Sequence, residues 1–222
     1  AITEPAKLSQ LLRSIDDYDG NSVVKFALKL LPHIFVRPGE LRAMKWADID
    51  FLTAEWRYTI PKTKTEHIVP LTSYAIKLLT ELQQVSGPSD YVFPSVRSNA
   101  RPISDNTLNA AFRRLGYGKD EVSAHGFRAT ARTLLDEILQ ERVEFIEQQL
   151  GHMVKDALGR AYNRTKHLPQ RHKMMQRWSD YLEGLKKCRD CHYKTTEKIH
   201  QCNLASCPDS TLSNCIIILA SG

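Results

Sequence analysis

The sequence contains 222 residues, enough for one hydrophobic core with or without an appendage. Hydrophobic residues make up 42% and charged residues 25% of it, which is the balance of a soluble globular protein. Its apolar runs are far shorter than the roughly 20 residues that span a bilayer, and its N-terminus has no secretory pattern. We therefore expect a cytoplasmic protein with no membrane contact, and its net charge of +6 is compatible with a polyanionic partner.

Three helices are predicted near the N-terminus. Thr3 can cap a helix over residues 3–16, in which leucine and isoleucine recur at helical spacing. A second, strongly apolar helix is predicted over residues 22–31. It should stop before Pro32, because the residue before a proline disfavours helical backbone. A short helix then opens at residues 38–44, with proline in its first turn.

The next segment is typical of a small antiparallel sheet. Trp56, Tyr58 and Ile60 alternate with polar residues, and the alternation returns at residues 67–69. Between them lies a basic turn that carries Lys62. This pattern predicts a strand, a turn and a returning strand.

The remainder of the first 185 residues is mostly helical in pattern, with one short extended piece at residues 91–93. Helices are predicted between Thr72 and Ser86, and over residues 105–115, 124–139, 143–150, 155–163 and 169–184. The expected fold class is therefore mainly α with a small antiparallel β-sheet (α+β).

The composition changes near residue 186. All five cysteines lie beyond this point: Cys188, Cys191, Cys202, Cys207 and Cys215. An odd number of cysteines cannot close completely into disulfides within one chain, and their spacing is too loose for a strong zinc signal. We expect residues 1–185 to form one domain and residues 186–222 to be a disordered tail that binds no metal; a zinc site in the tail is the alternative.

Four groups of residues suggest chemistry, although each of them alone is more often structural. In chain order they are Arg37 before Pro38-Gly39-Glu40, Lys62 in the β-turn, His125-Gly-Phe-Arg128, and Gly151-His152 with Tyr162 ten residues further on. Cations and hydrogen-bond donors of this kind suit a phosphodiester whose transition state gathers negative charge on its non-bridging oxygens. A tyrosine adds a phenolic oxygen that can attack phosphorus and hold a covalent intermediate. Asp48 and Asp50 lack a ligand partner nearby, so a mechanism without a metal or other cofactor is the simpler interpretation.

These motifs resemble the catalytic domain of the tyrosine recombinases, the phage integrase family. The likeness rests on Arg-Pro-Gly-Glu-Leu-Arg at 37–42, His-Gly-Phe-Arg-Ala-Thr at 125–130 and Ala-Tyr-Asn-Arg at 161–164. It is strongest toward the integrases of satellite prophages and genomic islands, and it extends over residues 2–184. The resemblance implies the fold of that catalytic domain. It also implies a site-specific recombinase that breaks and rejoins DNA through a 3′-phosphotyrosine, without a metal.

The resemblance also implies which residues bind the phosphate. Arg37 and Arg128 would clamp the scissile phosphate between them. His125 would donate to the phosphate or carry a proton, and His152 would position it. Glu40 is expected to support Arg37 rather than to take part in the reaction.

Two further residues would make and break bonds, again by resemblance. Tyr162 would be the nucleophile, and Lys62 would protonate the departing 5′ oxygen, with Lys64 as a weaker candidate. The implied partners are double-stranded DNA at attachment sites, other integrase subunits in a tetramer on that DNA, and host DNA-bending and excision proteins. The expected location is the bacterial cytoplasm, at the nucleoid. Integrases of this family carry further domains ahead of the catalytic one, so we expect the chain to be a fragment.

Two alternatives stay open. A type IB topoisomerase uses the same arginine, lysine, histidine and tyrosine chemistry, but it relaxes supercoils instead of recombining two sites. An inactive DNA-binding remnant of a degraded prophage integrase would keep the fold and lose the reaction.

Overall fold

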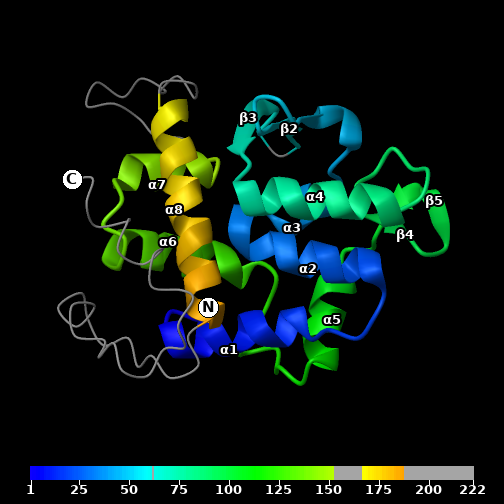
Figure 1. Ribbon diagram of the computed structural model, residues 1–222, viewed down its shortest axis with the longest axis horizontal. Helices are drawn as coiled ribbons and strands as arrows, with labels where there is room; N and C mark the ends of the chain where they lie inside the picture. The colour runs from blue at the N-terminus through cyan, green and yellow to red at the C-terminus, as the bar shows by residue number, and fades with distance from the viewer. Residues whose placement is uncertain (62, 153–166, 188–222) are drawn as a thin grey trace, which may run out of the picture. The chain divides into compact units, whose positions relative to one another are not determined.

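The computed structural model describes residues 1–61, 63–152 and 167–187, and helices dominate this part of the chain (Figure 1). The helices are α1 (Pro5–Asp16), α2 (Ser22–Ile34), α3 (Pro38–Arg42), α4 (Ser73–Val85), α5 (Thr107–Arg114), α6 (Gly126–Glu137), α7 (Val143–Gln149) and α8 (Leu168–Lys187), with a 3₁₀ turn η1 (Trp46–Asp48). Strands β1 (Ile49–Asp50), β2 (Glu55–Ile60) and β3 (Thr65–Pro70) form one antiparallel sheet in that order, and β4 (Pro94–Ser95) pairs with β5 (Ser98–Pro102). The expected fold class, mainly α with a small antiparallel sheet, is confirmed.

Some predictions fall outside the described residues. They are the helix over 155–163 and everything expected of the tail beyond residue 187, including its disorder and its cysteines. The domain boundary at residue 185 therefore stays a prediction; α8 itself continues to Lys187. Within the described residues, no helix has the length and apolar character needed to cross a membrane.

Helix α2 lies at the centre of the core. It packs against α1, α3, α4, α5, α6 and α8, and Figure 1 shows α4 running alongside it. Ala27, Leu28 and Leu31 are fully buried, and a helix that is apolar on most sides belongs inside a domain. Asn21 caps its first turn, since its side-chain oxygen accepts the Val24 N–H at 3.2 Å. Because α2 is central, the segment that leads from it to Arg37 begins with two buried residues, Phe35 and Val36.

The prediction that this helix stops before Pro32 is wrong, because α2 continues through Pro32 to Ile34. A proline removes one N–H from the helix ladder. Here the loss falls in the last turn, where Ile34 and Phe35 are fully buried. Phe35 ends the helix in the left-handed conformation, with φ 36°, and its N–H donates to the Leu31 carbonyl at 2.9 Å. Burial of these apolar side chains offsets the missing bond.

The predicted hairpin is confirmed as β2 and β3. Its register pairs Tyr58 with His67 and Trp56 with Val69. The Tyr58 ring stacks on Trp56 at a centroid distance of 4.2 Å and meets His67 edge-on at 5.5 Å. Since Trp56, His67 and Val69 are buried, this face of the hairpin lies against the core.

The second sheet, β4 and β5, was not predicted as a pair of strands. The strand β5 is exposed at most of its positions and contains serine, asparagine, arginine and proline. Because no buried face marks it, the period-2 pattern that identifies a strand is absent.

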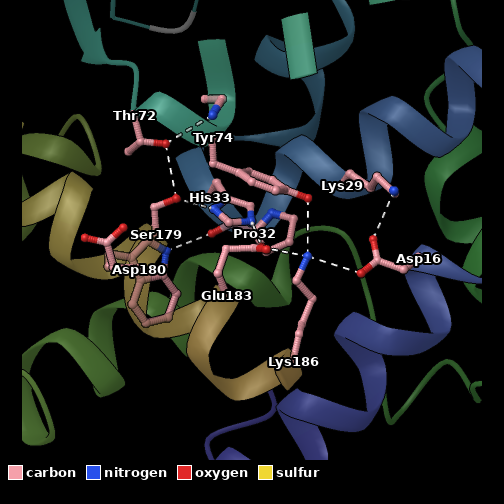
Figure 2. Close-up of polar contacts among 12 residues, drawn as sticks. Asp16, Lys29, Pro32, His33, Thr72, Tyr74, Ser179, Asp180, Glu183 and Lys186 are labelled. Carbon is pink, nitrogen blue, oxygen red and sulfur yellow. Dashed lines mark hydrogen bonds and ion pairs between the residues drawn. The ribbon is translucent and has the colours of Figure 1, made fainter. Parts of the chain in front are cut away.

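Buried and half-buried polar contacts hold α8 against the rest of the core (Figure 2). The two ring nitrogens of His33 lie 2.8 Å from Ser179 Oγ and 3.5 Å from Glu183 Oε1. Burial lowers the pKa of His33, so the ring is held neutral. Lys186 Nζ lies 2.6 Å from Glu183 Oε1 and 3.1 Å from Asp16 Oδ2. These contacts join α8 to both α1 and α2.

Candidate active site

Arg37 is positioned by the local structure of the N-terminus of α3. Pro38 takes the first helical position, where its missing N–H costs nothing. Two positions later, the Glu40 carboxylate reaches back and accepts the Arg37 backbone N–H at 3.1 Å. The same carboxylate accepts from the Arg37 guanidinium at 2.8 Å. Among the described residues, Glu40 is the one hydrogen-bonding partner of this guanidinium, and it holds the Arg37 side chain in place.

Tyr58 holds the other side of Glu40. Its hydroxyl donates to Glu40 Oε2 at 2.8 Å, and Glu40 is buried. Burial, followed by the charge of Glu40, raises the pKa of Tyr58 far above its usual value. The phenol therefore stays protonated and acts as a donor, so Tyr58 is unsuited to be a nucleophile although it lies beside the site.

Arg128 is buried, and the ends of two helices hold its guanidinium. One nitrogen donates to the Phe35 carbonyl at 3.3 Å and the other to the Leu150 carbonyl at 2.8 Å. Phe35 and Leu150 are the C-caps of α2 and α7, so both carbonyls lie at the negative end of a helix dipole. Burial, and then the charge of Arg37, lower the pKa of Arg128, but a guanidinium stays charged in proteins.

The end of α7 brings His152 to Arg128. Gly151 adopts φ 69° and its N–H donates to the Gln148 carbonyl, while the His152 N–H donates to the Glu147 carbonyl, both at 3.0 Å. This pair of bonds is a Schellman motif, which turns the chain back over the last turn of the helix. As a result His152 Nε2 lies 3.3 Å from an Arg128 nitrogen.

His125 is exposed and lies immediately before α6, three residues ahead of Arg128. Its pKa is lowered by partial burial and then by the positive charges of Arg128 and Arg37. Both charge effects lower the pKa, which means that His125 lies within electrostatic range of both guanidinium groups. At neutral pH its ring is predominantly neutral.

The structure brings together four of the six residues that the sequence predicted for this site: Arg37, His125, Arg128 and His152. Arg37, Arg128 and His152 meet at the turn of Gly151: a Cβ built on Gly151 would lie 3.7 Å from an Arg37 nitrogen, and His152 Nε2 lies 3.3 Å from an Arg128 nitrogen. His125 belongs to the group through its charge interactions with both guanidinium groups. The other two, Lys62 and Tyr162, lie outside the described residues. Lys64 is described: it is exposed in the turn between β2 and β3, with φ 53°.

Arg171 lies in the stretch 160–177, which contains six arginines and lysines and no aspartate or glutamate, a composition typical of a solvated helix face. Arg171 is buried; it donates to Gln149 Oε1 at 2.6 Å and to the Ile68 carbonyl. It therefore ties α8 to α7 and β3 from inside the core. Arg177 is exposed but pairs with Glu141 at 2.9 Å, and Lys173 is exposed.

Sequence reasoning missed two residues that support the site. Tyr58 was interpreted only as part of a strand, and Glu147 was not singled out at all. Glu147 accepts from the His152 ring at 2.5 Å and from Arg132 at 2.8 Å. A carboxylate five residues before a histidine, with glycine between them at the helix end, is the signal that would have found it.

Replacing Gly151 by alanine is expected to destabilise the protein more than the same change at Gly116. Both glycines have positive φ, 69° and 92°, which costs alanine about 1 kcal/mol or more. At Gly116 the added Cβ meets nothing within 4 Å, whereas at Gly151 it lies 3.0 Å from Ile60 Cδ1. We expect Gly151→Ala to lower the free energy of unfolding by about 2 kcal/mol, measured by urea denaturation. Equal losses for the two variants would show that the turn is not crowded against β2.

The sequence comparisons identify the family of this chain. Residues 2–168 match the phage integrase family, so the chain belongs to that family, as the motifs predicted. It is 37% identical over 194 residues to the integrase of Enterobacteria phage P4, an alignment that covers 80% of this chain and 44% of that protein. It is 35% identical over 196 residues to IntB of Escherichia coli (strain K12), covering 81% of this chain and 50% of that protein. The chain thus spans half, or somewhat less, of the length of these relatives.

Solved structures confirm the fold. An integrase from mycobacterium phage Brujita superimposes with a TM-score of 0.58 at 13% identity, over 80% of this chain and 61% of that one. The catalytic core of lambda integrase gives a TM-score of 0.51 at 24% identity, over 72% of this chain and 94% of that one. The described residues therefore have the predicted fold of a tyrosine recombinase catalytic domain. Within them, no three histidine, cysteine, aspartate or glutamate side chains gather as metal ligands.

Proposed function

We propose that this chain is the catalytic domain of a site-specific DNA recombinase, a prophage integrase that breaks and rejoins DNA through a phosphotyrosine. One observation carries the proposal: two anchored guanidinium groups, Arg37 and Arg128, meet the imidazole of His152 at the Gly151 turn, and His125 interacts electrostatically with both of them. A guanidinium presents a planar fork that fits phosphate oxygens, and donors held in place in advance stabilise charge that develops in the transition state. Membership of the phage integrase family supports the same chemistry.

The reaction would proceed as an exchange at one phosphorus atom. The Tyr162 hydroxyl loses its proton to solvent, and its oxygen attacks phosphorus and forms the 3′-phosphotyrosyl bond, while the bond from phosphorus to the 5′ oxygen breaks. Lys62 gives its proton to that 5′ oxygen, with Lys64 as the weaker candidate for the role. Arg37, Arg128 and the two histidines hold the non-bridging oxygens. A 5′ hydroxyl of a second strand then reverses the step and releases the tyrosine, so no external energy source is required.

Several partners belong to this proposal. A fragment of lambda integrase with the same fold was solved as a dimer bound to a core site, which supports duplex DNA and further subunits as partners. Assembly into a tetramer on paired attachment sites, contact with host DNA-bending and excision proteins, and a location at the nucleoid in the bacterial cytoplasm are further parts of the proposal. The division of the chain into a catalytic domain of residues 1–185 and a Cys-rich tail of residues 186–222 completes it.

Covalent capture tests the proposal. The chain is incubated with a pool of nicked suicide duplexes that have a randomised core sequence, so that no attachment site has to be known. We expect a covalent protein–DNA adduct that forms equally well in EDTA, because cationic side chains take the part that metal ions play in other nucleases. Loss of the adduct in EDTA, restored by magnesium, would overturn the metal-free mechanism.

The same assay separates the two alternatives when a supercoiled plasmid is added. Relaxation of any plasmid in many turnovers, without selection of a core sequence from the pool, would favour a type IB topoisomerase. Retention of duplex DNA without any adduct would favour an inactive remnant. Selection of one family of core sequences in the adduct is the result expected of an integrase.

A further inference from the structure

Glu147 is the one acidic side chain, among the described residues, that hydrogen-bonds to a histidine of the site. Its Oε2 lies 2.5 Å from His152 Nδ1, and its Oε1 accepts from Arg132 Nε at 2.8 Å. Arg132 comes from α6, one turn beyond Arg128, so the contact links α6 and α7. Both oxygens of the carboxylate are thus occupied by partners from different elements.

The backbone makes this pairing possible. In a Schellman motif the residue two positions past the C-cap folds back over the third residue from the helix end, and the two side chains commonly form an apolar contact. Here those two positions are His152 and Glu147, whose backbones are joined by a hydrogen bond of 3.0 Å. The usual apolar contact is replaced here by a carboxylate and an imidazole, whose side chains are hydrogen-bonded to each other.

We propose that Glu147, clamped by Arg132, is a positioning residue that holds His152 in the Nδ1–H tautomer and aims its Nε2 at the phosphate beside Arg128. The inference rests on the proposed function, because it assigns a supporting role at the same site. Glu147 itself touches no reacting atom.

The tautomer follows from the donors and acceptors. Burial opposes ionisation of Glu147, but hydrogen bonds from His152 and Arg132 outweigh it and lower the pKa of this carboxyl. An ionised carboxylate only accepts, so Nδ1 carries the proton. In a neutral ring Nε2 then bears a lone pair, and it faces an Arg128 nitrogen at 3.3 Å that can only donate. Each hydrogen bond in the series Arg132–Glu147–His152–Arg128 therefore joins one donor to one acceptor.

The same arrangement prepares the ring for a phosphate. A phosphate oxygen is an acceptor, so Nε2 binds it only after taking a proton from solvent. The resulting imidazolium would stand next to Arg128, and the negative charge of Glu147 compensates for this added positive charge. Without Glu147 the ring would be free to rotate and would lose this compensation.

Nitrogen NMR of the histidine rings tests the tautomer directly in the protein without DNA. In the wild type the His152 ring should show a protonated Nδ1, whereas Glu147→Ala should shift the ring toward the Nε2–H form that free imidazole side chains prefer. Glu144→Ala is the matched control, since Glu144 lies on the same helix and pairs with Arg142 at the surface. An unchanged His152 ring in Glu147→Ala would overturn the inference.

Covalent capture tests the consequence for catalysis. Glu147→Ala should slow adduct formation about 10- to 100-fold, the range expected for losing a hydrogen bond to a charged group, with DNA binding and thermal stability close to those of Glu144→Ala. In a His152→Ala background, the same change should add almost nothing, because the residue that Glu147 positions is already gone. Glu147→Gln, which keeps an acceptor oxygen and loses the charge, should lie between the wild type and Glu147→Ala.

The outcomes separate the two proposals. Two results, each with a wild type that forms the adduct, would refute the positioning role and leave the proposed function standing. In the first, Glu147→Ala forms adduct as fast as Glu144→Ala. In the second, Glu147→Ala slows adduct formation in the His152→Ala variant as much as it does in the wild type. If the wild type forms no adduct that depends on Tyr162, the proposed function fails, and the catalytic role of Glu147 fails with it.

Discussion

Replacing Tyr162 by phenylalanine is expected to abolish covalent capture while leaving DNA binding intact. The change removes one oxygen, the atom that we propose attacks phosphorus, and keeps the ring. Removal of a nucleophile typically lowers the rate of the chemical step by a large factor, on the order of 10⁴ or more. Adduct on nicked suicide duplexes, measured by denaturing gel electrophoresis, should therefore be undetectable. DNA binding should persist, because contacts to phosphate come from other residues.

Tyr58→Phe is the matched control for this experiment. Tyr58 also lies beside the site, but its hydroxyl is committed to Glu40 and its pKa is raised by burial. This variant should still form the adduct, at a rate reduced only through a less well-held Arg37. If the adduct persisted in Tyr162→Phe and disappeared in Tyr58→Phe, the nucleophile would be misassigned.

Arg128→Lys should be nearly as damaging, although it conserves the charge. A lysine ammonium cannot reach two carbonyls and a phosphate with the planar fork that a guanidinium offers. We expect single-turnover cleavage to fall by roughly 10²- to 10³-fold, the usual effect of removing one preorganised donor from a transition state. The free energy of unfolding should also fall by about 1–3 kcal/mol, because the carbonyls of Phe35 and Leu150 lose their buried donor.

Arg13→Lys controls for the substitution itself. Arg13 donates to Ser9 Oγ at 2.6 Å at the end of α1 and makes no described contact with the site. Cleavage is compared at a temperature where all variants are folded, so that stability and chemistry are separated. A rate for Arg128→Lys no lower than that for Arg13→Lys would show that Arg128 is a structural tether and not part of a phosphate clamp.

Local sequence rules predicted most of the helices because the forces that define them act over a few residues. Thr72 caps α4 through the Ala75 N–H at 3.2 Å, and the leucines of that helix follow the helical period. The motif around Arg37 is equally local, since Glu40 reaches back three residues to its N-cap. The candidate site residues were found in the same way, as short motifs, before their positions in space were known.

The failures have one physical cause, which is that burial is decided by distant parts of the chain. Pro32 was expected to end a helix, but the surrounding apolar core keeps α2 intact for one more turn. Arg171 looked like part of a basic surface, yet Gln149 and the Ile68 carbonyl give its guanidinium buried partners that no local pattern could reveal.

The sequence by itself determined the class of fold and the family, and it predicted the charged residues of the candidate site. Only the tertiary structure decided how those charges are held. Arg128 takes its two carbonyl partners from Phe35, 93 residues earlier, and from Leu150, 22 residues later. Glu147 becomes a partner of His152 only because Gly151 turns the chain back at the end of α7. A guanidinium or an imidazole has the same chemistry in any sequence, and what orients it is the set of acceptors that folding brings within hydrogen-bonding distance.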